Sequence, residues 1–134
     1  MRKRRIPFAK VQRLFNSAIK RRDYKCMIRD FEPCFGQLEC SHFFSVGSSP
    51  ALRFYPYNAW TQCSNHHARH HNVTTETYRT WLLENYPDKV EFMERHKSSY
   101  LKYTDWLKAE IIRLCREDKL EELARLIEKE LAGS

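Results

Sequence analysis

The sequence predicts an α+β fold in which a small strand, strand, helix (ββα) core that binds metal is flanked by an N-terminal basic helix and by C-terminal helices. Residues 40–72 contain five of the six histidines and two of the five cysteines, a density typical of metal sites. The flanking segments repeat apolar residues at helical spacing, whereas the middle has the short apolar runs, glycines and prolines of a hairpin with irregular loops. For 134 residues we expect one compact domain made of a basic arm and helix (1–25), the metal-containing core (26–74) and a helical extension (75–134).

An N-terminal helix is expected to follow Pro7, because proline is favoured at the start of a helix. Its apolar residues recur at helical spacing, namely at Phe8, Val11, Leu14, Phe15, Ala18 and Ile19. Residues 1–25 also carry ten lysines or arginines against the single acid Asp23, while the rest of the chain is near neutral. This block of positive charge predicts a polyanion as partner.

The central segment is expected to form two strands and a helix. The turn Gly47-Ser48-Ser49-Pro50 separates a histidine-bearing strand (41–46) from a strand around Arg53. A helix is expected to begin near His66, so that the core would run strand, strand, helix.

The C-terminal extension is expected to be helical. Asp88 with Glu91 has the pattern of a capping box, and Thr104 is placed to cap a helix that carries Cys115 on its apolar, core-facing side. A last helix has apolar residues at Leu120, Leu123, Ile127 and Leu131. No hydrophobic run is long enough for a signal peptide or a membrane span, which predicts no membrane association and a cytoplasmic protein with reduced cysteines.

Cysteine and histidine spacing predicts a structural zinc site. Only two residues separate Cys63 from His66, so one tight turn can present both side chains to one ion. Pro33-Cys34-Phe35-Gly36 ends like a zinc knuckle, in which the glycine permits a tight turn beneath the metal. The favoured ligands are Cys26, Cys34, Cys63 and His66, with Cys40 as the alternative if the loop between Cys26 and Cys34 does not close.

A second set of side chains predicts a catalytic centre. His67 and His71 stand one helical turn apart, so both imidazoles can bind the same divalent ion. His42 lies in an apolar, strand-like run, and a neutral imidazole with a pKa of about 6.5 can take a proton from water. Asn58 is expected to hydrogen-bond the His42 ring and fix its tautomer. His70 and His96 are expected at the surface.

Several stretches resemble one family of nucleases. They are Ile19-Lys20-Arg21-Arg22-Asp23, Ser41-His42-Phe43, Pro50-Ala51-Leu52-Arg53-Phe54, Asn58, Gln62-Cys63, Asn72 and Tyr78. Over roughly residues 15 to 130 the chain is similar to phage HNH endonucleases of the His-Me finger class, and in particular to the lambda NinG (Rap) recombination nuclease family. Two positions depart from the family pattern, because Arg29 and His66 stand where paired cysteines are expected.

The resemblance implies a ββα-metal fold with a treble-clef-like zinc site, in a protein encoded by a phage or prophage and active in the bacterial host cell. It also implies hydrolysis of DNA phosphodiester bonds, with branched or recombination DNA as the preferred substrate. His42 would deprotonate the attacking water, while a divalent ion (Mn²⁺, Mg²⁺, Co²⁺ or Ni²⁺) held by His67 and His71 would stabilise the developing charge. A homodimer paired through the C-terminal helices is a further hypothesis, because a branched substrate has two strands to cut.

DNA contacts are expected from the basic arm and from arginines near the core. The residues are Arg2, Lys3, Arg4, Arg5, Lys10, Arg13, Arg53 and Arg69. Two other functions fit the same sequence: a non-catalytic, zinc-containing DNA-binding protein derived from an HNH nuclease, and an HNH nuclease that acts on RNA.

Overall fold

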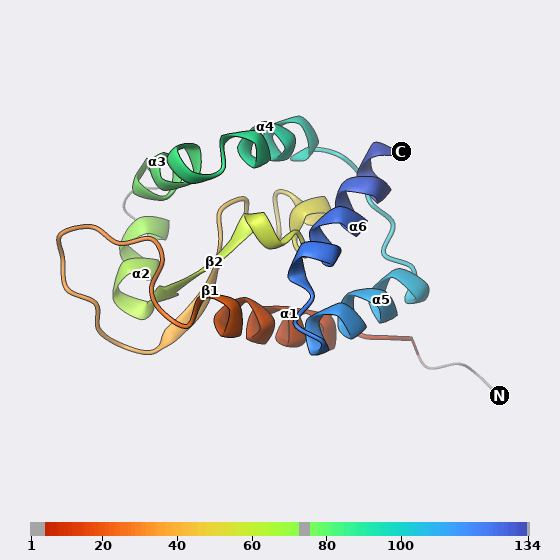
Figure 1. The fold of residues 1–134 in the computed structure, drawn as a ribbon, viewed down its shortest axis with the longest axis horizontal. Helices are drawn as coiled ribbons and strands as arrows, with labels where there is room; N and C mark the ends of the chain where they lie inside the picture. The colour runs from red at the N-terminus through yellow and green to blue at the C-terminus, as the bar shows by residue number, and fades with distance from the viewer. Residues whose placement is uncertain (1–4, 73–75, 134) are drawn as a thin grey trace.

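A two-stranded antiparallel sheet lies among six α-helices within residues 5–72 and 76–133, the part of the chain that the computed structural model describes (Figure 1). The side chains of His71 and Asn72 lie outside that part. In chain order the elements are α1 (Phe8–Asp23), β1 (Leu38–His42), the 3₁₀ turns η1 (Pro50–Leu52) and η2 (Pro56–Asn58), β2 (Ala59–Cys63), α2 (Ser64–Asn72), α3 (Glu76–Asn85), α4 (Pro87–His96), α5 (Asp105–Arg116) and α6 (Leu120–Ala132). This is an α+β fold, as predicted.

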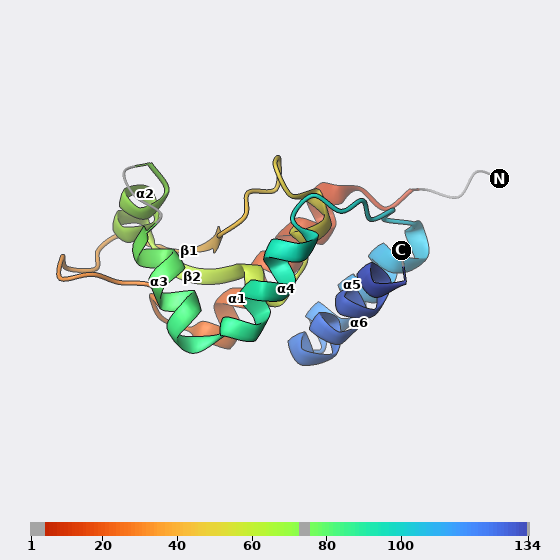
Figure 2. The ribbon, with the colours of Figure 1, turned by 90° about the horizontal axis from the view of Figure 1, so that it is seen from above.

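Helix α1 is the element against which both the sheet and the C-terminal helices pack. It begins directly after Pro7, and Val11, Phe15 and Ile19 on its apolar side are fully buried. This side contacts β1, β2 and α5, and it joins a single buried cluster that also includes side chains of α3, α4 and α6. Figure 2 shows α5 and α6 side by side at the end of the molecule that carries the N-terminus. The predicted N-terminal helix is therefore confirmed as a core element.

The strand register places Cys63 and His42 at opposite ends of the hairpin. Leu38 pairs with Cys63 at one end, and His42 pairs with Ala59 at the other. Every residue of β2 is buried. Helix α1 packs against this strand, and the Trp60 ring packs edge-to-face on Trp81 of α3. Helix α2 follows β2 without a break and begins at Ser64, two residues before the predicted start.

The predicted strand around Arg53 is wrong. Residues 50–58 form two 3₁₀ turns, each with a proline in its first turn, and extended pairing resumes only at Ala59. Pro50 and Pro56 explain the difference, because proline fixes φ near −65° and lacks the N–H that a paired strand needs. The second strand therefore lies six residues later than expected.

The helical extension is confirmed, with one correction. Thr104 caps α5, since its Oγ1 accepts a hydrogen bond of 3.1 Å from the Leu107 N–H, and Cys115 is buried in the core. The capping box predicted at Asp88 is wrong, because α4 begins at Pro87 and the residue before it makes no side-chain cap. None of the described helices is long and apolar enough to span a membrane.

The connection between α1 and β1 closes against the start of α2 through a turn at Gly36. This residue has φ of +86°, and a Cβ added to it would lie 1.7 Å from Ser64 Oγ. The Ser64 N–H donates to the Gln37 carbonyl at 2.9 Å, and the Asn65 N–H donates to the Phe35 carbonyl at 3.3 Å. The loop and the helix therefore meet too closely for a side chain at position 36.

Gly36→Ala should destabilise the protein by roughly 1 to 3 kcal/mol, because alanine would be strained at this φ and would collide with Ser64. Thermal unfolding of the variant beside the wild type measures the loss. Gly47→Ala is the matched control, because nothing lies within 4 Å of its added Cβ. Equal melting temperatures for the wild type and the Gly36 variant would contradict this account of the turn.

Candidate metal centre

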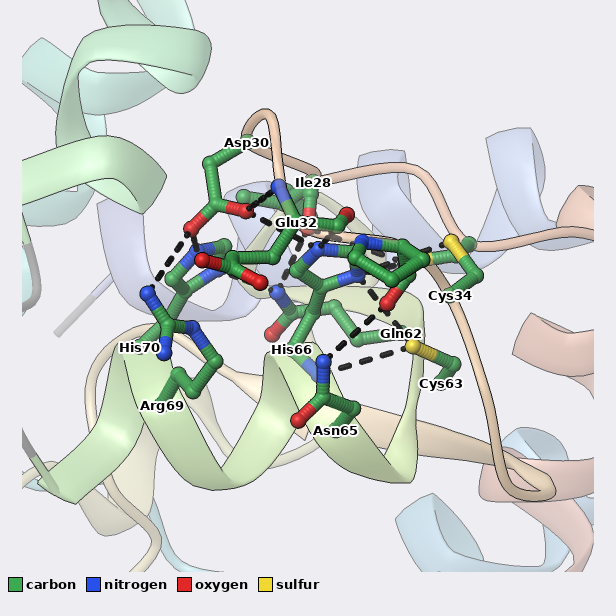
Figure 3. Close-up of polar contacts among 12 residues, drawn as sticks. Ile28, Asp30, Glu32, Cys34, Gln62, Cys63, Asn65, His66, Arg69 and His70 are labelled. Atoms are coloured by element: carbon green, nitrogen blue, oxygen red, sulfur yellow. Dashed lines mark hydrogen bonds and ion pairs between the residues drawn. The ribbon is translucent and has the colours of Figure 1, made fainter.

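Four side chains from three separate segments converge beside the start of α2. Figure 3 labels three of them, Cys34, Cys63 and His66. Cys26 follows α1, Cys34 lies on the loop before β1, Cys63 ends β2, and His66 lies in the first turn of α2. Their ligand atoms all lie within 4.8 Å of one another, and three of the four residues are buried. The structure thus gathers the four residues favoured from the sequence. Cys40, the alternative, lies within β1 opposite Thr61 and outside this group.

The ring of His66 is oriented so that Nδ1 faces the three sulfur atoms. The Nδ1 atom lies 3.6 Å from Cys26 Sγ, 3.5 Å from Cys34 Sγ and 3.2 Å from Cys63 Sγ. On the opposite side of the ring, Nε2 lies 3.1 Å from Asp30 Oδ1 and 2.9 Å from the Glu32 carbonyl oxygen. Both of these oxygens only accept hydrogen bonds, so Nε2 carries the proton and the Nδ1 lone pair points at the sulfurs. This is the tautomer that a metal ligand needs.

The donor set and its spacing fit a tetrahedral zinc ion. Zinc–sulfur bonds of ~2.3 Å and zinc–nitrogen bonds of ~2.05 Å place sulfur and nitrogen about 3.6 Å apart around a tetrahedron. The observed separations of 3.2 to 3.6 Å match this value. Three thiolates and one imidazole are also a common ligand set of structural zinc. The Cys₃His cluster can therefore hold a structural metal ion such as zinc.

An acidic side chain in the loop joins the cluster to a second histidine. Asp30 accepts hydrogen bonds from Nε2 of His66 and from Nε2 of His70, the latter at 3.3 Å. The Gln62 amide donates to His70 Nδ1 at 2.7 Å and to the Ile28 carbonyl at 2.8 Å. His70 is only 2% exposed, so the prediction that it lies at the surface is wrong. Its position on the same helical face as His66 explains this burial.

Local hydrogen bonds set the charge states in this network. Despite partial burial, which favours the neutral acid, hydrogen bonds from the Glu32 N–H, His70 and His66 hold the pKa of Asp30 at about 2. Burial lowers the pKa of His70 and keeps its ring neutral. Burial likewise disfavours the thiolate of Cys63, but hydrogen bonds from the His66 and Phe35 N–H groups offset it and bring the pKa of this thiol to about 7. Cys63 is therefore readily deprotonated for metal binding.

The predicted general base lies at the far end of the hairpin, on the side of α1. The His42 ring packs 5.8 Å from the Phe15 ring, and its Nε2 donates a hydrogen bond of 2.9 Å to the Arg53 carbonyl. The Asn58 amide is engaged elsewhere: it accepts from the Phe44 N–H and donates to the Phe44 and Leu52 carbonyls. Asn58 therefore ties the loop to the strand, and the Arg53 carbonyl takes the role predicted for Asn58.

Of the two histidines predicted to bind a catalytic ion, the structure describes the side chain of one, His67. His67 lies on α2, and its Nδ1 is 2.9 Å from Glu39 Oε1. His71 lies in the last turn of α2, but its side chain is outside the described part. Among the described residues, the Cys₃His cluster is the one group of three or more potential ligands that could hold a metal. Glu39 and His42 lie three positions apart on β1, so their side chains project from opposite faces of the strand.

The predicted DNA-binding residues fall into three groups. Arg2, Lys3 and Arg4 lie outside the described residues, while Arg5, Lys10 and Arg13 are exposed. The Arg53 guanidinium is half-buried against the rings of Phe8 and Phe54, and its Nε donates to the Gln12 side-chain oxygen. Arg69 is exposed and lies 3.7 Å from Asp30.

Comparison with models of protein families shows to which family this chain is related. The family model described as the bacteriophage lambda NinG protein matches residues 1–128 of the 134. The chain belongs to the NinG family. No curated protein and no solved structure matches it. Membership in NinG, a family named after a bacteriophage protein, is consistent with phage encoding.

Sequence reasoning missed the roles of three residues around the centre of this NinG protein: Asp30, Gln62 and His70. Asp30 and Gln62 act through hydrogen bonds to residues distant in sequence, so no local spacing marks them. For His70, the four-residue interval from His66 was the available signal.

We expect about one zinc per chain, and we expect Cys34→Ser to lose it while Cys40→Ser keeps it. The reason is that Cys34 lies in the cluster and Cys40 lies in the strand. Elemental analysis of both purified variants gives the stoichiometry. Loss of zinc from the Cys40 variant together with retention by the Cys34 variant would reverse the assignment.

Asp30→Ala should weaken zinc binding by about 10- to 100-fold, because the carboxylate fixes the His66 ring from the side opposite the sulfurs. Competition with a chromogenic zinc chelator measures the affinity. Glu32→Gln is the matched control, since Glu32 contacts His66 through its backbone carbonyl, which the substitution keeps. An affinity unchanged by Asp30→Ala would mean that the carboxylate does not orient the ligand.

Proposed function

We propose that this NinG protein is a metal-dependent DNA endonuclease of the HNH (His-Me finger) type. The observation that carries the proposal is the hydrogen bond of 2.9 Å from His42 Nε2 to the Arg53 carbonyl. A carbonyl only accepts hydrogen bonds, so Nε2 donates in this contact, and in the neutral ring Nδ1 would hold the lone pair. This is the tautomer that a general base acting through Nδ1 requires. Family membership over almost the whole chain supports the proposal.

The order of elements also supports this assignment. Strands β1 and β2 pair antiparallel and α2 follows directly, with His42 at the end of β1 and the candidate metal residues on α2. This order is the one that the ββα-metal fold requires. The zinc cluster fixes the start of α2 against the loop, so it acts as a structural anchor and leaves the chemistry to other side chains.

In the proposed reaction, His42 Nδ1 takes a proton from a water molecule, which attacks the phosphorus in line as the bond to the leaving oxygen breaks. His67 and Glu39 offer a nitrogen and an oxygen ligand 2.9 Å apart for a divalent ion, and His71, whose side chain lies outside the described part, is the further ligand proposed from the sequence. An ion held there would supply positive charge at the phosphate and at the leaving oxygen. Exposed Arg5, Lys10 and Arg13 bind the DNA backbone. The proposed substrate is DNA, with branched recombination intermediates as the preferred form.

One observation favours a second candidate, a non-catalytic zinc-containing DNA-binding protein. Within the described residues, His42 faces α1 whereas Glu39 and His67 meet at the other end of the hairpin. Assays on supercoiled plasmid, branched DNA and RNA with a panel of divalent ions separate the two candidates. They also test the RNA-directed alternative.

His42→Ala should lower the cleavage rate by about 10²- to 10⁴-fold while DNA affinity is retained, because the change removes a general base and no phosphate contact. Single-turnover cleavage at saturating DNA and a separate binding titration give the two quantities. His96→Ala is the matched control, since this histidine at the end of α4 packs on Phe92 and hydrogen-bonds Ser99, away from the hairpin. Equal rates for the wild type and the His42 variant would remove His42 from the mechanism.

Cleavage should be faster with Mn²⁺, Co²⁺ or Ni²⁺ than with Mg²⁺ at equal concentration. Imidazoles such as His67 are ligands that these ions accept, whereas Mg²⁺ prefers oxygen ligands in octahedral geometry. Initial rates with each ion test this expectation. If Mg²⁺ is the best activator by a wide margin, the ion is held by oxygen ligands such as Glu39, and histidine is not its main ligand.

A further inference from the structure

The loop that carries the zinc ligands also exposes two aromatic rings. Phe31 is 91% exposed and Phe35 is 62% exposed, although apolar residues elsewhere in the described chain are mostly buried or half-buried. Figures 1 and 2 both show this loop, drawn in orange, projecting at the end of the molecule farthest from the N-terminus. Two exposed phenylalanine rings close together in one loop are candidates for contact with a ligand.

The loop that presents these rings is held in place on both sides of Phe31. Cys26 and Cys34 anchor it at the metal centre, and Ile28 is fully buried. Directly beside Phe31, Asp30 binds His66 and His70, and the Glu32 carbonyl binds His66. The Phe31 ring is therefore presented by a fixed backbone, so little conformational entropy is lost when it binds.

The surroundings of the rings favour a nucleic acid over a protein partner. Lys25 and Arg29 are both exposed and precede Phe31 in the same loop by six and two residues, while the negative charge of Asp30 is directed at histidines and at Arg69. Exposed cations and exposed aromatic rings in one loop are the side chains that contact phosphates and bases. Two isolated rings also present far less apolar surface than the roughly 1,200 Å² that a stable protein interface buries. A nucleobase, by contrast, needs only one ring to stack on.

We propose that Phe31 stacks on an unpaired base of the bound DNA, with Phe35 as a second stacking ring and with Lys25 and Arg29 contacting neighbouring phosphates. The proposal rests on the proposed action on DNA and adds a recognition element to it. The proposal gives the metal centre a second role, because the zinc cluster would hold the loop that carries Phe31 as well as the start of α2. Stacking selects unpaired bases over paired ones, since a paired base within a duplex already has its faces covered.

The test measures binding of the full chain, with zinc retained and no other divalent ion added, to two DNA duplexes. One carries a three-nucleotide bulge with 2-aminopurine at its centre, and the other is fully paired. Phe31→Ala should weaken binding to the bulged duplex by about 5- to 100-fold and abolish the change in 2-aminopurine fluorescence, because stacking on one base has this magnitude. Affinity for the paired duplex should stay within twofold. Phe31→Trp should keep both signals.

Tyr100→Ala is the matched control, because Tyr100 is also an exposed aromatic, at 79%, and lies outside the zinc loop. Unchanged binding of Phe31→Ala to the bulged duplex would overturn the proposal, as would equal losses in the Phe31 and Tyr100 variants. A wild type that binds both duplexes equally would overturn it as well. The assay requires no cleavage, so a wild type that prefers the bulge but never cuts DNA would refute the proposed nuclease and leave base stacking supported.

Discussion

The convergence of three sulfurs on His66 Nδ1 is the contact on which the rest of the structure depends. It joins the end of α1, the long loop before β1, the end of β2 and the start of α2 at one point. The loop has few apolar anchors of its own, Ile28 being the main one, so hydrophobic burial alone gives it little stability. Structural zinc in small domains binds with apparent free energies of about 10 to 16 kcal/mol, and this binding energy becomes folding energy. The ion would therefore supply the stability that a loop of this kind lacks.

The metal centre holds β2 and α2 at one end of the hairpin, and the strand pairing then determines where His42 lies at the other end. Cys63 pairs with Leu38 beside the metal, and His42 pairs with Ala59 four residues along the strand. At ~3.3 Å per residue, this places the metal end and the histidine end about 13 Å apart along the strand. The separation lets one small domain hold a structural ion and still leave a half-buried histidine on the side of α1. There, the backbone carbonyl of Arg53 rather than a side chain sets the tautomer of the ring.

The zinc ligands could be predicted from the sequence because their signals are local, whereas the residues that support them could not. Cys63 and His66 lie within one turn, and Gly36 marks the knuckle through the positive φ that it adopts. Asp30 and Gln62 act through hydrogen bonds that span more than thirty residues or join a strand to a helix, and such contacts leave no periodic pattern. The strand expected around Arg53 is wrong for a different reason: it was placed directly after the turn at residues 47–50, whereas Pro50 and Pro56 favour 3₁₀ turns there.

X-ray absorption at the zinc edge tests the central claim most directly, because it reports the atoms bound to the ion without requiring a variant to fold. The account predicts a four-coordinate ion with three sulfur neighbours at ~2.3 Å and one nitrogen neighbour at ~2.0 Å. Four sulfur neighbours would mean that another cysteine replaces His66. A shell made mainly of oxygen, or a folded protein without zinc, would contradict the account altogether.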